Sequence, residues 1–210
     1  MKLKRASAET GQKRIVSRAD AVALMIASAA AALLTTAATV SGIVALFTGP
    51  VTLVLPVATS HQVARGLALE ATGHFTSVEA TIPVLPSGPA ASLAWAGGLN
   101  QVGVLAVLAL LFLLAYRLQS RILFTAKSAH LVGAAGAILA VAGTVGQVLD
   151  EVGRSRLAEM IGANARAGGE AQVFSAEFNI GPLMLGMVLL LVAGVFEYGR
   201  RLQKDTEGLV

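Results

Sequence analysis

Cysteine is absent from this chain, and charged residues are scarce. Without cysteine, disulfide bonds and thiolate metal ligands are excluded, and the sequence carries no sign of the redox state of its compartment. Charged residues make up 13% of the chain, about half the share that is usual in soluble proteins. Together with an apolar fraction of 55%, this composition favours a membrane protein.

Long uncharged runs show where the chain crosses a membrane. A bilayer core of about 30 Å needs about 20 apolar residues in a helix. Four stretches are long enough, and we predict spans at about 21–47, 93–116, 128–149 and 178–197. Because backbone amides in lipid must bond within their own segment, the predicted fold is all-α, a four-helix transmembrane bundle. The sequence 21–210 then forms one four-span domain behind a basic N-terminal tail, 1–20.

The first apolar run follows a basic segment, so a cleaved signal peptide is the alternative interpretation. The apolar core of a signal peptide has about 7–15 residues. The run 21–47 is much longer. We therefore predict that it is retained as a membrane helix.

Basic residues are distributed unevenly between the segments that join the spans. Twelve of the 16 fall on one side: Lys2, Lys4, Arg5, Lys13, Arg14, Arg18, Arg117, Arg121, Lys127, Arg200, Arg201 and Lys204. The other four are Arg65, Arg154, Arg156 and Arg166. The positive-inside rule makes the crowded side cytoplasmic. Both termini are then cytoplasmic, including the tail 198–210, as an even number of spans requires.

The outer segment 48–92 contains two β-like runs, 51–58 and 76–85. In the second run, apolar and polar residues alternate with period two, which indicates a half-buried strand. Pro56 and Pro83 indicate edge or irregular strands. We predict a small extracytoplasmic β-like segment of two or three strands between helices 1 and 2, packed on the membrane end of the helices.

The second outer segment, 150–177, begins with apolar residues at helical spacing. We predict that it extends the third helix out of the membrane until Gly168 and Gly169 break it. Asp150 and Arg154, four residues apart, are expected to pair on this extension.

Small residues recur at spacing four in the first and third spans. Close helix contacts in lipid need such residues. We therefore predict that these two spans meet at the centre of the bundle, with Gly133, Gly136 and Ala140 as packing positions, and that the leucine-rich second and fourth spans face lipid. The alternative is that alanine is simply abundant in this composition.

Polar chemistry inside the spans is sparse. Asn100, Gln101, Gln147 and Asn179 are predicted near the outer ends of the helices, at the interface rather than around a vestibule. The three histidines, His61, His74 and His130, do not make up the three or four ligands of a zinc site. No nucleophile elbow, phosphate loop or metalloprotease motif occurs. We therefore predict no enzyme activity and no cofactor.

Two stretches carry a family resemblance: "ILFTAKSAHLVGAAGAIL" from Ile122, and the C-terminal "LMLGMVLLLVAGVFEYGRRLQKDTEGLV". The pattern resembles the DUF2975 family of bacterial four-span membrane proteins of unknown function. It rests mainly on Phe124, Thr125, Glu197, Gly199, Arg200, Leu202, Asp205, Gly208, Leu209 and Val210. Before Phe124 the chain has Ile122 and Leu123 where relatives often have Gly and Pro. The resemblance implies the bacterial inner membrane, and a small helix-turn-helix regulator as a neighbour.

Two functional hypotheses remain from the sequence. The first is a membrane sensor or anchor for a cytoplasmic partner, bound through Phe124, Thr125, Glu197, Gly199, Arg200, Asp205, Gly208, Leu209 and Val210. The tail residues Leu209 and Val210 would contact that partner, or fold back on the inner loop near Phe124. The second is a small transporter or channel subunit that acts as a homo-oligomer. Both place the chain in a lipid bilayer, and neither involves direct nucleic acid binding.

Overall fold

The computed structural model describes residues 18–57, 63–64, 73–74, 76–119, 126–163 and 178–207. These residues form four helices and four strands. The helices are α1 (Arg18–Thr48), α2 (Ser87–Gln119), α3 (Ala126–Met160) and α4 (Gly181–Glu207). The strands are β1 (Val51–Pro56), β2 (Val63–Ala64), β3 (Gly73–His74) and β4 (Ser77–Ile82).

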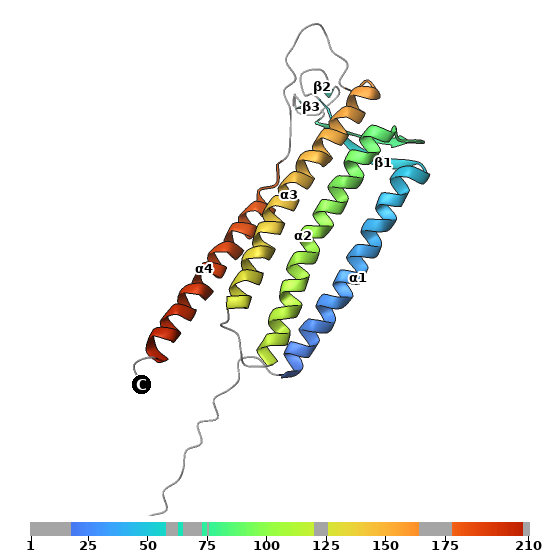
Figure 1. Cartoon of the computed structure of the whole chain (residues 1–210). Helices are drawn as coiled ribbons and strands as arrows, with labels where there is room; N and C mark the ends of the chain where they lie inside the picture. Colours follow the sequence, from blue (N-terminus) through green and yellow to red (C-terminus); the bar gives the residue numbers. More distant parts are fainter. Residues whose placement is uncertain are drawn as a thin grey trace, which may run out of the picture.

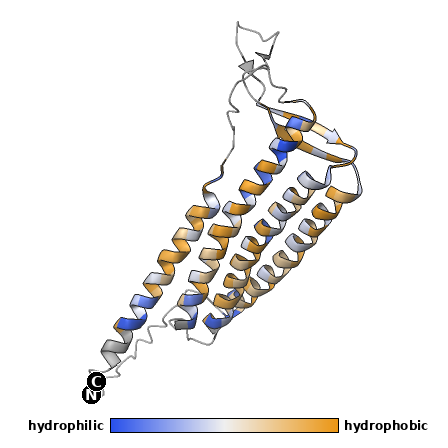
Figure 2. Cartoon of the chain, turned by 45° about the horizontal axis from the view of Figure 1, so that its top comes forward, coloured by the Kyte–Doolittle hydropathy of each residue, from blue (hydrophilic) through white to orange (hydrophobic). Residues whose placement is uncertain are grey.

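All four helices are long and apolar enough to cross a bilayer. The predicted all-α membrane fold with four spans is therefore confirmed, and the chain is a multi-pass membrane protein. Figure 2 shows apolar residues along the length of the helices and hydrophilic residues concentrated near their ends. Trp95 and Tyr116 are exposed on α2 and lie about 32 Å apart, at about 1.5 Å per residue. This spacing matches the two interfaces of a bilayer, where aromatic residues gather.

The helices stand side by side in sequence order, each antiparallel to the next (Figure 1). α1 packs on α2, α2 on α3, and α3 on α4. The prediction that the first and third spans meet at the centre is wrong, because α2 lies between them. The helices at the two ends of the row, α1 and α4, have the smallest shares of buried residues and so face lipid most. The prediction that the fourth span faces lipid agrees with this order, but the first span is more exposed than the second, which the sequence did not predict.

β1 and β4 form an antiparallel pair at one end of the helices, which we call the cap end. The register pairs Leu53 with Ala80 and Val54 with Glu79. Leu53 and Ala80 pack against the buried core, whereas Val54 and Glu79 are exposed. The predicted alternation in 76–85 is thus confirmed only for Ala80 and Ile82, which are half-buried, whereas Val78 and Val84 are exposed and the strand ends at Ile82.

The cap has its own apolar core, made by the sheet and the ends of two helices. Its buried members are Leu55, Leu85, Ala90, Leu93, Leu157 and Ala158. Leu157 and Ala158 belong to the last turns of α3, so the predicted extension of the third helix is what supports the strands. At 35 residues, α3 is about 52 Å long, well beyond the bilayer core of about 30 Å.

α3 ends earlier than predicted. Gly162 has a φ of 75°. Its N–H donates to the carbonyl oxygen of Glu159, and the N–H of Ala163 donates to the carbonyl oxygen of Ala158. This is a Schellman cap, in which the left-handed residue is usually glycine. The helix therefore stops near Gly162, and the predicted break at Gly168 and Gly169 lies outside the described residues.

α4 continues to Glu207, although the sequence predicted a span that ends near 197 and a tail beyond it. The charged residues after Phe196 keep helical geometry because lysine, arginine, glutamine and glutamate are all good helix formers. This end of the molecule, where α1 begins and α4 ends, is called the tail end below.

Candidate functional site

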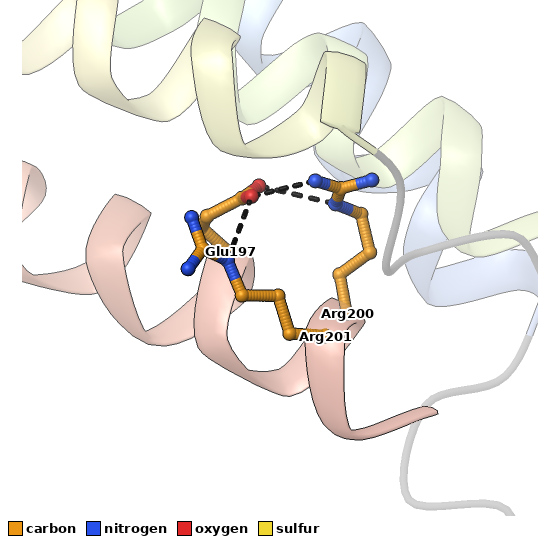
Figure 3. A network of polar contacts seen from close by, with 3 residues as sticks. All are labelled: Glu197, Arg200 and Arg201. Carbon is orange, nitrogen blue, oxygen red and sulfur yellow. Dashed lines mark hydrogen bonds and ion pairs between the residues drawn. The ribbon is translucent and has the colours of Figure 1, made fainter. Parts of the chain in front are cut away.

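A cluster of three charged side chains lies at the tail end of α4 (Figure 3). Arg200 donates from Nη2 to Glu197 Oε1 at 2.6 Å and from Nε to Oε2 at 3.1 Å. Arg201 donates from Nε to Oε1 at 3.4 Å. One turn of helix brings positions 197, 200 and 201 to the same side. The carboxylate therefore holds two guanidinium groups, one tightly and one loosely.

The other residues of the predicted partner surface are placed only in part. Gly199 lies in α4 with open space around the position of a side chain, so no close contact demands glycine there. Asp205 belongs to the last turns of α4. Phe124, Thr125, Gly208, Leu209 and Val210 lie outside the described residues, as does the predicted contact between the tail and the inner loop.

The end of α2 and the beginning of α3 are joined by a hydrogen bond, also at the tail end. Arg117, in the last turn of α2, donates from Nη1 to the hydroxyl of Ser128 in the first turn of α3. Ser128 is fully buried. This contact fixes the two helix ends that flank the connection 120–125, in which the family resemblance begins at Ile122.

A polar cluster joins α1 to α2 inside the span. Gln101 Nε2 donates to the hydroxyls of Thr35 at 3.1 Å and Thr36 at 2.9 Å. Thr39 Oγ1 donates to Gln101 Oε1 at 3.1 Å. Both amide protons and the carbonyl oxygen are thus paired, which removes most of the cost of burying an amide in lipid. Gln101 lies near the middle of α2, and its predicted position near the outer end of the span stays a prediction.

A second polar contact ties the cap to α3. Arg154 pairs with Asp150, Nε to Oδ2 at 2.6 Å, which confirms the predicted pair. Its Nη1 also donates to the carbonyl oxygen of Val54 in β1 at 3.0 Å. The sequence gives the ion pair through the spacing of four, but it contains no signal for the contact with the strand.

Glycines set the distance between α3 and α4. A Cβ at Gly136 would lie 2.8 Å from the carbonyl oxygen of Gly186 and 2.8 Å from the Cβ of Leu189. A Cβ at Gly186 would lie 2.7 Å from the Cβ of Ala140. Gly133, on α3, faces Ala193 of α4. These packing positions therefore contact α4, and not α1 as predicted.

The beginning of α4 is fixed to α3 by two amide side chains. The main-chain N–H of Asn179 donates to Gln147 Oε1 at 2.8 Å, and Asn179 Oδ1 accepts from Gly181 N–H at 2.8 Å. Asn179 thereby satisfies one of the free amides at the start of the helix. Gln147 and Asn179 therefore join the beginning of α4 to α3.

Within the part of the chain that the structure describes, no group of three or more His, Asp or Glu side chains is arranged to hold a metal ion. His130 lies in the first turns of α3, remote from the other two histidines in sequence and at the opposite end of the helices from β3. The side chains of His61 and His74 lie outside the described set.

Comparison with known proteins adds no relative. No family model, no curated protein and no solved structure matches this chain.

Proposed function

We propose that this chain is a non-enzymatic protein of the bacterial inner membrane that senses a condition outside and holds a cytoplasmic partner inside. The tail end, with both termini, is cytoplasmic in this proposal, and the cap lies outside. The uneven distribution of basic residues supports that orientation. The resemblance to the DUF2975 family supports a small helix-turn-helix regulator as the partner.

The observation that carries the proposal is the course of α3. Its last turns form part of the cap core through Leu157, and Arg154 bonds β1. Its first turn lies at the tail end, where Ser128 is bonded to Arg117. A continuous helix packed on both neighbours transmits a displacement better than a loop does. A ligand that shifts the cap would therefore shift the tail end.

A transporter or channel subunit is the alternative function. The four helices form a single row, each packed on its neighbours in sequence. A row encloses no path between its helices, so a pore would require further copies of the chain. The sensor or anchor is therefore the function that the geometry supports best.

Affinity purification tests the proposal. The full-length tagged protein is extracted from native membranes, and co-purifying proteins are identified by mass spectrometry. We expect one cytoplasmic protein to be enriched with the full chain and lost when Gly208–Val210 is deleted. A matched variant, Glu79→Gln in the cap, should retain it. The proposal is wrong if the full chain and the deletion variant recover the same proteins.

A further inference from the structure

We infer that the tail end of α4 is a binding site for the phosphate of an anionic phospholipid, held by Arg201 with Arg200 beside it. The inference goes beyond the proposed function, and it requires no protein partner. Both arginines lie at the end of the apolar stretch of α4, which runs from Gly181 to Leu202. At about 1.5 Å per residue, Arg201 lies about 30 Å along the helix from the start of that stretch. This distance equals the thickness of the hydrocarbon core, so Arg201 reaches the headgroup region of the second leaflet.

The donors of the two guanidinium groups are only partly used. An arginine has five N–H donors and no acceptor. Arg200 uses Nε and Nη2 on Glu197, and Arg201 uses Nε alone. Nη1 and Nη2 of Arg201 donate to no acceptor among the described residues. The side chain of Arg201 is 72% exposed, against 40% for Arg200.

Glu197 positions both groups. Its carboxylate lies between the two guanidinium groups, and Arg201 is bonded to it through Nε (Figure 3). The three side chains together thus keep a net positive charge of one, and the largely exposed Arg201 offers a planar fork of donors. That fork matches the oxygens of a phosphate, which accept charge-assisted hydrogen bonds in parallel pairs.

The surroundings favour a lipid over a soluble anion. Tyr198 is 66% exposed and Leu202 51% exposed, on the same last turns of α4 as Arg201. A free phosphate gains nothing from these apolar surfaces, whereas the glycerol and upper acyl chain of a phospholipid cover them. Basic residues at this depth attract anionic lipids by charge as well.

Fluorescence quenching by brominated lipids tests the inference at the site itself. The chain has one tryptophan, Trp95, at the cap end. In a Trp95→Phe, Tyr198→Trp variant, the sole tryptophan reports the lipids beside Arg201. The protein is reconstituted with brominated phosphatidylglycerol or brominated phosphatidylcholine. We expect phosphatidylglycerol to be preferred at this site, and Arg201→Gln to weaken that preference about fivefold.

Two controls isolate the site. Arg156→Gln removes the same charge from an exposed position near the end of α3, and the preference should remain. Trp95 in the unaltered chain reports the cap end, where no such preference is expected. Equal quenching by the two lipids beside position 198, or a preference unchanged by Arg201→Gln, overturns the inference. So does an Arg201→Gln variant that loses capture of a cytoplasmic protein but retains the lipid preference.

Discussion

The guanidinium of Arg154 donates to the carbonyl oxygen of Val54 at 3.0 Å, and so joins residues 100 positions apart in the sequence. The same side chain is held on α3 by Asp150. β1 is therefore attached to α3 by a hydrogen bond, and also by the burial of Leu55 in the apolar cluster that includes Leu157. A two-stranded sheet is marginal on its own in water, so these contacts explain why this one is ordered.

Replacement of Arg154 by glutamine is expected to loosen the cap without unfolding the helices. Hydrogen bonds of charged groups contribute about 1.5–3 kcal/mol, and partial exposure reduces this to about 1 kcal/mol. Amide hydrogen exchange in β1 should then be about fivefold faster, with no change in α1. Arg156→Gln, nearby and exposed, is the control. Equal exchange in β1 of the Arg154 variant and the unaltered protein would show that apolar burial alone holds the sheet.

Replacement of Gly136 by leucine is expected to separate α3 from α4. The new Cβ would lie 2.8 Å from the carbonyl oxygen of Gly186, which belongs to the backbone and cannot rotate away. Overpacking of this kind costs about 1–3 kcal/mol. The measurement is thermal unfolding in detergent. Gly194→Leu is the matched control, because nothing lies within 4 Å of its Cβ position; if both variants melt alike, the close contact carries no special weight.

Replacement of Gln101 by leucine is expected to weaken the contact between α1 and α2. Three hydrogen bonds are lost, and interhelical bonds in membranes average about 0.6 kcal/mol each. Two of the threonines keep a local partner, since Thr35 and Thr36 both donate to the carbonyl of Ala32. Thermal unfolding in detergent should show a loss of about 1–2 kcal/mol. Asn100→Leu, at the adjacent exposed position, should change stability much less. A gain in stability for Gln101→Leu would contradict this prediction.

The orientation of the chain can be measured with single cysteines, because the natural sequence has none. Glu79 lies on the exposed face of the cap, and Lys127 is exposed at the tail end. In intact cells, a membrane-impermeant maleimide is expected to label a Glu79→Cys variant and not a Lys127→Cys variant. Permeabilised cells should label both. The reverse pattern in intact cells would place the cap in the cytoplasm.

The helices could be predicted from the sequence because each satisfies its own backbone in lipid, so length and composition suffice. The strand 77–82 was predictable for a similar reason, since its alternation puts the half-buried residues Ala80 and Ile82 on one face. The predicted contact of the first span with the third was wrong, and the contact of the third span with the fourth was not predicted. Small residues such as Gly136 show that a face allows close approach, but they do not say which helix approaches it. Gly186, on α4, has the matching small surface.

The charged cluster at the tail end follows from the sequence only in part. Glu197 stands three and four residues before Arg200 and Arg201, a spacing that allows it to pair with either arginine, and the structure shows both pairs. Which arginine holds the carboxylate closely, and which stays largely exposed, depends on side-chain geometry that no sequence pattern describes.

The sequence by itself determined that this chain spans a membrane four times, because hydrocarbon excludes unpaired backbone groups and charged side chains over about 20 residues. It also determined that the strand 77–82 has a half-buried face and that Asp150 meets Arg154, since both depend on neighbours in the chain. Tertiary structure alone decided the order of the helices, the pairing of Gln101 with three threonines, and the attachment of Val54 to Arg154. Those contacts join distant segments, and they depend on the three-dimensional fit of surfaces whose partners the local pattern leaves open.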